Sequence, residues 1–227
     1  MELYYHPLSR YSQKVLLALY EKQANFFPRV TDLQDPLERQ HYLHFYPSGK
    51  LPLLVCQDGS LLPESSIIIE YLDNKMDAGT RLLPKEPELN LQVRLYDRIA
   101  DNDLNNSLYQ LEQQYSLPEE QQLPLVQRQI ENRLRLCLRA LDLRLVEHHW
   151  LCGDGFTLAD CALIPCLGYL QRSFNLLDYQ HLGRYWLQAQ LRGSWMLVQD
   201  EVTLAQEEAS SGSGPSPEQE FSCYGPF

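Results

Sequence analysis

Several common features are missing from this sequence of 227 residues, and each absence excludes a class of protein. No segment approaches the roughly 18 consecutive apolar residues of a membrane span. No run rich in Lys and Arg is present, and 19 basic against 30 acidic side chains give a formal charge of −11. This balance argues against nucleic acid and anionic membranes as partners. The chain begins without a basic and then apolar export signal, so we expect a cytoplasmic protein.

The cysteines lack the spacing of a disulfide scaffold or a metal site. The sequence has six cysteines and no CxxC pair, whereas a secreted scaffold would be shorter and denser in cysteine. The closest pairs, Cys161 with Cys166 and Cys152 with Cys161, fit neither a zinc knuckle nor a redox dithiol. We therefore expect free, mostly buried thiols and no metal, so any reactive sulfur must belong to a bound ligand.

The first 80 residues alternate strand and helix patterns. Short aromatic and aliphatic runs predict strands, and stretches of helix formers with an apolar stripe predict helices. A turn at Gln57-Asp58-Gly59 joins two of these strands as a hairpin. The predicted order is βαβαββα, with strands at 3–5, 26–30, 53–55 and 60–62 and helices at 12–22, 36–45 and 64–75. An α/β domain with a small mixed sheet is therefore expected over residues 1–80.

Strand patterns stop after this region. Two prolines, Pro84 and Pro87, and the lack of an apolar period mark residues 81–88 as a linker. Helix formers dominate residues 89–208, so the second domain is predicted to be all-helical. A Ser/Gly/Pro-rich tail follows at 209–227. The tail ends in aromatic residues, so a disordered terminus and a docked one both stay open; these aromatics are Phe221, Tyr224 and Phe227.

Two segments of the first domain carry candidate ligand-binding chemistry. In Gly49-Lys50-Leu51-Pro52, the proline stands where the chain enters a strand. It is either an edge-strand proline or a cis turn that presents the Leu51 backbone to an extended peptide. In Pro63-Glu64-Ser65-Ser66, a carboxylate and hydroxyls open a helix. They are either helix caps, or a site where Ser65 and the helix N–H groups bind a carboxylate while Glu64 binds an ammonium group.

The loop between the first strand and the first helix is the third candidate. Open α/β sheets place their ligands at loops that leave the carboxyl end of a strand and lead into a helix. A hydroxyl in this loop lies in the positive potential of the helix start, where it could donate to a bound thiol and favour the thiolate. Ser9, Tyr11 and Ser12 compete for this role, and each could instead be only a cap.

Together the three segments resemble the glutathione-binding domain of the cytosolic glutathione S-transferases. The matching stretches are His6-Pro7-Leu8-Ser9, Pro47-Ser48-Gly49-Lys50-Leu51-Pro52 and Glu64-Ser65-Ser66, in that order. The likeness continues at Gly153 to Asp160, which is similar to a turn before a helix in the family's second domain. There Thr157 and Asp160 are predicted to form a capping box, which is a structural feature. The resemblance is to a serine-type, bacterial-like member and assigns no class.

The resemblance implies a thioredoxin-like N-terminal domain on an all-helical C-terminal domain, as a homodimer with glutathione as co-substrate. By position, Ser9 matches the residue that faces the glutathione sulfur, with Tyr11 and Ser12 as fallback donors. A serine there implies stabilisation of the thiolate, whereas a cysteine would imply mixed disulfides.

The same resemblance implies the other glutathione contacts. Leu51 matches the residue before the cis-proline, Pro52, whose backbone pairs with the cysteinyl part of glutathione. Glu64 and Ser65 match the pair that holds the γ-glutamyl group. Tyr46 departs from the family, which often has Asn there, and basic residues near the glycine carboxylate are less clearly placed; the candidates are His41, His44 and Lys50.

A small electrophile is expected in the cleft between the two domains. The side chains expected to line this cleft lie on helices of the second domain that would face the first, and they are Tyr96, Asn102, Asn105, Tyr109 and Tyr169.

Two functions are open at this point. The first is an enzyme that ionises glutathione and directs the thiolate at an electrophile, by conjugation, dehalogenation, ether cleavage or isomerisation. The alternative is a non-catalytic binding or regulatory module that keeps the fold. A glutaredoxin-like reductase needs a cysteine near the first helix, where this chain has Ser9 and Ser12.

Overall fold

The strands form one mixed sheet in the computed structural model, which describes residues 1–211. The sheet order is β2-β1-β3-β4, with bounds β1 (Glu2–Tyr5), β2 (Phe27–Val30), β3 (Leu53–Val55) and β4 (Leu61–Pro63). β1 pairs with β2 in parallel and with β3 antiparallel, and β3 pairs with β4 antiparallel. The predicted βαβαββα order and thioredoxin-like sheet are confirmed.

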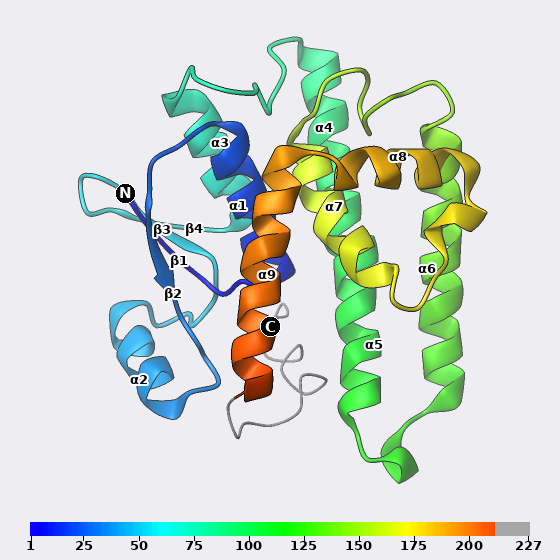
Figure 1. Ribbon diagram of the computed structural model, residues 1–227, viewed down its shortest axis with the longest axis horizontal. Coiled ribbons are helices and arrows are strands. Elements are labelled where there is room, and N and C mark those ends of the chain that lie inside the picture. Colours follow the sequence, from blue (N-terminus) through cyan, green and yellow to red (C-terminus); the bar gives the residue numbers. More distant parts are fainter. Residues whose placement is uncertain (212–227) are drawn as a thin grey trace.

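Three helices complete the first domain, α1 (Arg10–Glu21), α2 (Pro36–Phe45) and α3 (Ser65–Lys75). Helices α1 and α3 pack against each other between the sheet and the helical domain. Helix α2 lies apart from them, near the carboxyl end of β2 (Figure 1). Helix α1 begins two residues earlier than predicted, because the Ser9 side chain caps it by accepting the Ser12 N–H.

The second domain is all-helical, as predicted, with α4 (Pro87–Ile99), α5 (Asn106–Ser116), α6 (Pro124–Arg144), α7 (Leu158–Leu170), α8 (Gln180–Gln190) and α9 (Gly193–Ser211). A π-helical segment, Ala100–Asn105, joins α4 to α5. Helix α9 extends to Ser211, so the first residues of the predicted tail are helical. The expectation for the tail aromatics lies outside the described residues.

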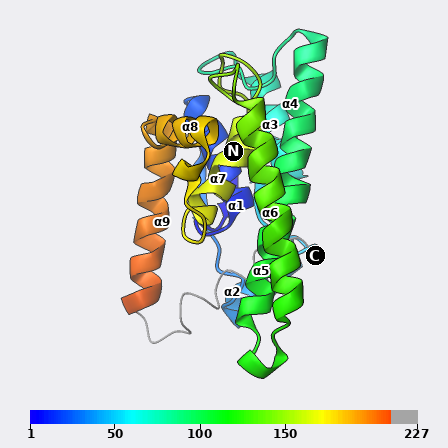
Figure 2. The ribbon, with the colours of Figure 1, turned by 90° about the vertical axis from the view of Figure 1, so that its right-hand side faces the viewer.

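Helix α7 is the centre of the molecule. Nearly all of its residues are buried, as expected for a helix that is apolar on every face. It contacts α1 of the first domain and α4 and α8 of its own, and it continues through Pro165. Figure 2 shows α5 and α6 side by side at one edge of the molecule and α9 at the other. One continuous hydrophobic core therefore spans both domains.

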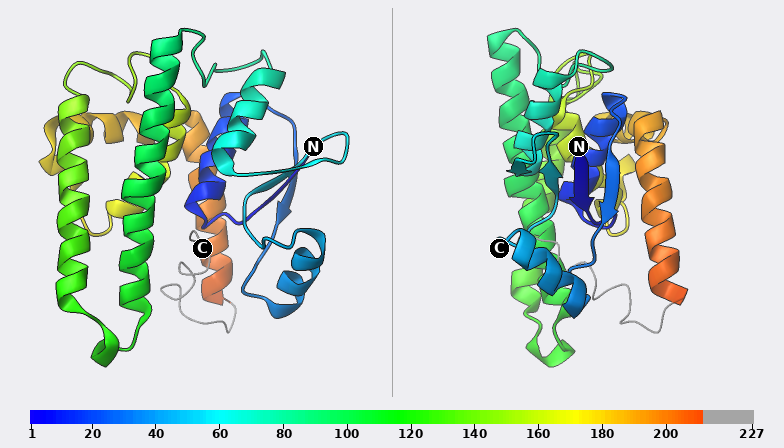
Figure 3. Two further views of the ribbon diagram at one scale, coloured as in Figure 1. Left: turned by 180° about the vertical axis from the view of Figure 1, so that it is seen from behind. Right: turned by 90° about the vertical axis from the view of Figure 1, so that its left-hand side faces the viewer.

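The chain between the domains is anchored to the first domain. From Met76 to Glu86 it forms neither helix nor strand, and it crosses at one end of the molecule (Figure 3). Leu82 and Leu83 are buried and donate their N–H groups to the Asp73 carboxylate at 2.9 and 3.0 Å. Helix α4 begins at Pro87, inside the segment predicted as a linker. In the described chain, no helix is both long and apolar enough to cross a membrane.

Candidate active site

The strand register brings the three candidate segments to one end of the sheet. Leu53 of β3 lies opposite Tyr4 of β1 on one side and opposite Pro63 of β4 on the other. At this end the chain leaves β1 for α1, enters β3 from Pro52 and leaves β4 at Glu64. Because neighbouring strands lie about 4.8 Å apart, these three backbone segments are adjacent. Residues far apart in the sequence thus surround one small region at the starts of α1 and α3.

Ser9 lies at the start of α1 with its hydroxyl directed at the helix. Its Oγ accepts the Ser12 N–H at 3.4 Å, and its own N–H donates to the His6 carbonyl at 3.0 Å. An accepted bond leaves the hydroxyl proton available for a ligand. The side chain is 1% exposed. Ser9 therefore combines a cap with a donor in the positive potential of the helix start.

The two fallback donors have other surroundings. Ser12 is fully buried, and its Oγ accepts the His6 N–H at 3.3 Å, so it holds the loop together. Tyr11 is half-buried, and burial, followed by the nearby Asp101 carboxylate, raises its pKa well above the usual tyrosine value. Tyr11 therefore keeps its proton at neutral pH.

The peptide between Leu51 and Pro52 is cis. The alternative of an edge-strand proline is wrong, because β3 lies inside the sheet and Pro52 precedes its first residue. Pro52 is buried and Leu51 is half-buried. The Tyr42 hydroxyl donates to the Lys50 carbonyl at 2.8 Å and fixes the chain that enters the turn.

The candidate basic residues lie on the surface beside this turn. Lys50, His41 and His44 are all exposed. A ring nitrogen of His44, Nδ1, lies 2.8 Å from the Gln40 carbonyl within α2. Of the three, Lys50 is the one that directly precedes the cis turn.

Glu64 adopts an unusual backbone conformation at the start of α3. Its φ is 72° and its ψ is 115°, and its exposed side chain makes no capping hydrogen bond. The interpretation of Glu64 as a side-chain cap is therefore wrong. A non-glycine residue in this region costs about 1–3 kcal/mol, and such residues cluster at ligand sites. Ser65 follows as the first residue of the helix and is 5% exposed.

A buried ion-pair network supports the start of α3. The Lys14 ammonium of α1 lies 2.5 Å from an Asp97 oxygen and 2.8 Å from an Asp101 oxygen, and it donates to Ser66 Oγ at 2.9 Å. Arg98 contacts both carboxylates at 3.0 and 2.5 Å. The network therefore joins α1, α3 and the end of α4, directly next to Ser65. Sequence reasoning missed it, although a lysine in the apolar stripe of a helix is a signal that a buried acid must pair with it.

A second buried ion pair fixes the residue after Ser9. The Arg10 guanidinium donates to both Glu112 oxygens of α5, at 2.5 and 3.0 Å, and to Asn105 Oδ1 at 2.5 Å. The Tyr169 ring lies 4.9 Å from the same guanidinium. Planar, bidentate pairing of this kind fixes orientation as well as distance. The sequence alone gives no signal that Arg10 would reach α5.

The predicted cleft residues separate into two groups. Asn105 and Tyr169 lie together around Arg10, as described above. Tyr96 is not part of this group. Its ring lies 5.0 Å from the Arg144 guanidinium of α6, inside the helical domain. Asn102 is exposed and Tyr109 is half-buried.

The capping box before α7 is present, as predicted, with Thr157 and Asp160. The Asp160 carboxylate is fully buried and accepts the Leu151 N–H, the Thr157 N–H and hydroxyl, and the Tyr185 hydroxyl, at 2.8–3.0 Å. Burial outweighs these bonds and raises the pKa of Asp160 to about 6. The capping box is structural and lies outside the candidate site at the starts of α1 and α3.

The described cysteines are free, and four of these five are buried, as predicted. Burial raises the pKa of Cys152 and of Cys166 to about 12, so neither is a thiolate at neutral pH. Over residues 1–211, no three His, Cys, Asp or Glu side chains converge to hold a metal.

This fold, with a hydroxyl donor at the start of α1 beside a cis-proline turn and the start of α3, defines a class of thioredoxin-like proteins that carry an all-helical second domain. Comparison with known proteins identifies the family. The "Glutathione S-transferase, N-terminal domain" model matches residues 3–80, and the "Glutathione S-transferase, C-terminal domain" model matches residues 123–189. The chain belongs to the cytosolic glutathione S-transferase superfamily.

Individual relatives agree with this assignment. Glutathione S-transferase F10 of Arabidopsis thaliana is 28% identical over 209 residues, which cover 88% of this chain and 97% of that protein. The maleylacetoacetate isomerase of Pseudomonas aeruginosa is 30% identical over 181 residues, covering 77% and 82%. A glutathione S-transferase of Methylobacillus flagellatus, solved with glutathione bound, superposes with a TM-score of 0.78 at 27% identity, covering 88% and 98%.

Proposed function

We propose that this protein binds glutathione at the sheet end formed by the β1–α1 loop, the 51–52 turn and the start of α3, and that Ser9 stabilises its thiolate for attack on a small electrophile. The strand register that makes these three segments adjacent carries the proposal. The relatives named above support glutathione as the ligand.

Each segment supplies one part of the binding. The N–H groups at the start of α3 and the Ser65 hydroxyl bind the γ-glutamyl carboxylate, and the exposed Glu64 carboxylate binds the ammonium group. The Leu51 backbone pairs with the cysteinyl part as an added strand. Lys50, with His41 and His44 as alternatives, faces the glycine carboxylate.

The chemistry is a nucleophilic substitution or addition by sulfur. The thiol proton leaves to solvent, and the anion that remains on sulfur accepts the Ser9 O–H in the positive potential of α1. The thiolate electron pair then forms the new bond to the electrophilic carbon. In a substitution the leaving group departs with its bonding pair, and in an addition the π pair of the attacked double bond moves to its far atom, which takes a proton from solvent. Cys152 and Cys166 are protonated at neutral pH, and the reacting sulfur is proposed to be that of glutathione.

The pKa of the bound thiol tests the role of Ser9. Ultraviolet absorbance of the bound thiolate against pH gives this pKa, and a conjugation assay gives kcat/KM. Loss of one transition-state donor costs about a hundredfold in rate, so Ser9→Ala is expected to raise the thiol pKa and to lower kcat/KM by about that factor. Ser9→Thr keeps both the hydroxyl and the cap and should retain most of the activity. The exposed Ser48→Ala is the matched control.

Titration calorimetry tests the binding site separately. Glu64→Gln removes the charge that faces the ammonium group and should weaken glutathione binding roughly tenfold, the worth of one charge-assisted hydrogen bond. If wild type binds no glutathione at millimolar concentration, the proposal is wrong.

One observation favours the alternative of a non-catalytic binding module. Ser9 is 1% exposed and already caps α1, so it could serve only the fold. This alternative predicts glutathione binding without a lowered thiol pKa and without conjugation. Ser9→Ala would then change stability by about 1 kcal/mol, the worth of a cap, and nothing else.

We further propose that the protein is a homodimer through an exposed apolar surface on β4, α3 and α4. Leu91 and Leu95 are 69% and 54% exposed one turn apart on α4, and Ile67 of α3 and Leu61 of β4 are also exposed. The ion pair of Arg94 with Glu70 links α4 to α3. Apolar surfaces of this kind mark protein contacts. Light scattering after gel filtration should report a dimer for wild type and a monomer for Leu91→Glu with Leu95→Glu. The exposed Leu136→Glu on α6 should stay dimeric.

A further inference from the structure

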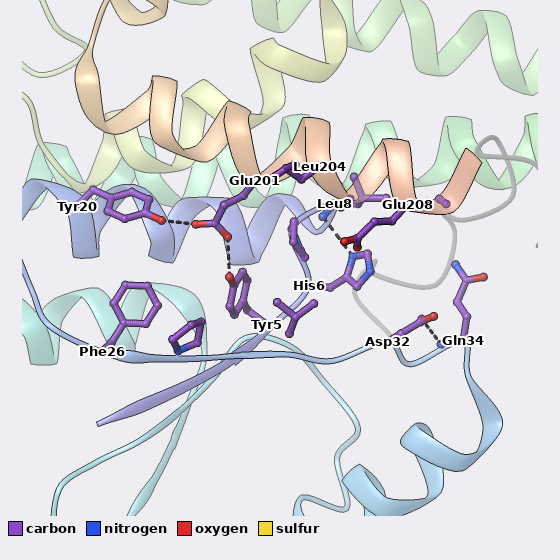
Figure 4. Close-up of a pocket in the computed structure, with 15 residues that line it drawn as sticks. Tyr5, His6, Leu8, Tyr20, Phe26, Asp32, Gln34, Glu201, Leu204 and Glu208 are labelled. Atoms are coloured by element: carbon purple, nitrogen blue, oxygen red, sulfur yellow. Dashed lines mark hydrogen bonds between the residues drawn. The ribbon is translucent and has the colours of Figure 1, made fainter. Parts of the chain in front are cut away.

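A cavity of about 540 Å³ lies between α9 and the first domain, on the β2 side of β1 (Figure 4). Its walls come from the β1–α1 loop, β2, the end of α1 and the last turns of α9. None of its lining residues belongs to the 51–52 turn or to the start of α3. The cavity and the proposed glutathione site therefore share the β1–α1 loop and otherwise differ, since the cavity lies beside β2 and the glutathione site beside β3, on the two sides of β1.

The charge of the lining has one sign. Three carboxylates face the cavity, those of Asp32, Glu201 and Glu208, and none of the described lining residues is Lys or Arg. Among the described lining residues, the one basic side chain is that of His6, whose Nδ1 accepts the Leu8 N–H at 3.2 Å. Burial lowers the pKa of His6 to about 4, despite the nearby Asp32 carboxylate, so it is neutral at pH 7. Within the described lining, no side chain thus carries a positive charge that would offset the negative potential of the carboxylates.

Glu201 is half-buried, and both of its carboxylate oxygens are hydrogen-bonded. One of its oxygens accepts the Tyr5 hydroxyl at 2.6 Å, and the other accepts the Tyr20 hydroxyl. Burial, followed by the bond to Glu201, raises the pKa of both tyrosines, so they remain neutral donors. Within residues 1–211, Glu201 forms no ion pair with Lys or Arg. Its two partners orient the carboxylate without cancelling its charge.

Aromatic rings complete this end of the cavity. Tyr5, Tyr20 and Phe26 all line it, and the centroids of the Tyr20 and Phe26 rings lie 6.4 Å apart. Figure 4 shows the three rings on the side of the cavity where the Glu201 carboxylate lies. Aromatic faces attract organic cations, and the attraction grows when the cation is desolvated.

We propose that this cavity binds a small organic ammonium ion with an apolar body. The ammonium group lies against Glu201 among the three rings, and the body lies along Leu204 and Pro28, which also line the cavity. An anion would meet three carboxylates. A purely apolar ligand would bury Glu201 without compensating its charge, which is costly.

Titration calorimetry with three probes of similar size tests the proposal, in the absence of glutathione. The probes are benzyltrimethylammonium as the cation, benzyl alcohol as the neutral compound and benzoate as the anion. We expect the cation to bind at least tenfold more tightly than benzyl alcohol and benzoate not to bind. Because no glutathione is present, failure here leaves the proposed function untouched.

Matched variants locate the site. Glu201→Gln keeps the shape of the side chain and can still form hydrogen bonds with both tyrosines. Because it removes the charge, it should weaken binding of the cation at least tenfold. Glu207→Gln removes one charge from the same helix at an exposed position outside the lining, and it should change affinity less than twofold. Phe26→Leu should weaken binding of the cation about threefold, which corresponds to the loss of one cation–π contact.

Three results would overturn the proposal. The first is no heat of binding for the cation at about 5 mM. The second is equal affinity for the cation and benzyl alcohol. The third is equal loss in Glu201→Gln and Glu207→Gln. If Glu201→Gln fails to fold, as circular dichroism would show, Glu208→Gln against Glu207→Gln decides the question, with at least a threefold difference expected.

Discussion

Replacing Lys14 with methionine is the most informative test of how α1, α3 and α4 are held together. The side chain is 1% exposed, and its ammonium contacts Asp97 and Asp101, which are 4% and 8% exposed. Methionine fills a similar volume, so the change removes the charge with little loss of packing. Two buried carboxylates then keep only Arg98, which is 51% exposed, as an ionic partner.

The structure sets the size of the expected effect. Removing one partner of a buried ion pair costs about 3–5 kcal/mol, because the other charge stays buried and unpaired. Arg98 still neutralises part of the charge, so we expect the lower end, about 3 kcal/mol, or roughly a hundredfold in the folding equilibrium. The control is Arg94→Met, which breaks the pair of Arg94 with Glu70 at 45% and 32% exposure. Such a pair is worth at most about 1 kcal/mol.

Urea unfolding at one fixed protein concentration measures both variants. A pH comparison then identifies the cause. Burial already raises the pKa of Asp101, and loss of Lys14, its largest stabilising charge, raises it further. A carboxyl whose pKa is higher in the folded than in the unfolded state takes up protons on folding, so Lys14→Met should lose less stability at pH 5 than at pH 7. Equal losses for Lys14→Met and Arg94→Met, or a loss that does not change with pH, would refute the reasoning.

Three further predictions concern the loop before α1, the ion pair that follows it and the capping box. Lysine at position 10 cannot form the bidentate pair with Glu112, so Arg10→Lys should lower the free energy of unfolding by about 2–3 kcal/mol. A loss under about 0.5 kcal/mol in thermal unfolding would contradict a stabilising role of this pair. The folded pKa of His6 is about 4, below its unfolded value of 6.5, so stability should be complete above pH 6.5 and fall by at most about 3 kcal/mol toward pH 4. His6→Asn, whose oxygen can accept the Leu8 N–H, should flatten that part of the pH profile of unfolding. Asp160→Ala leaves buried donors without an acceptor and should cost at least about 3 kcal/mol in urea unfolding, with Asp160→Asn losing less.

Local patterns were sufficient for the elements of the first domain. The apolar stripe of α1 and the Asp58-Gly59 turn have the periods and turn residues that define a helix and a hairpin. The predicted bounds of α2 agree with the structure at both ends, because Asp35 caps it before Pro36 and Pro47 follows its end. The π-helical segment at Ala100–Asn105 was not predictable, because its residues fit an ordinary helix equally well.

Part of the candidate site could likewise be predicted from the sequence, and part could not. Ser9, Pro52 and Glu64 could be proposed from the sequence because each stands at a boundary between elements, where sequence patterns are most specific. The positive φ of Glu64 was not expected, since nothing local demands it of a glutamate. Hydrogen-bond partners that lie far apart in the sequence could not be predicted. Tyr5 and Glu201 are 196 residues apart, and no periodicity links a strand to the last helix.

The charge of −11 has opposite consequences on the two sides of β1. Near Ser9 the acids are matched, since Lys14 and Arg98 pair with Asp97 and Asp101. The starts of α1 and α3 then add positive potential, which favours the anionic tripeptide proposed for this site although the protein repels anions at long range. Around Glu201 the hydrogen-bond partners are neutral hydroxyls, so the negative field stays uncompensated. The pairing of each acid, and not the net charge, is therefore the basis for the sign of ligand that we propose on each side.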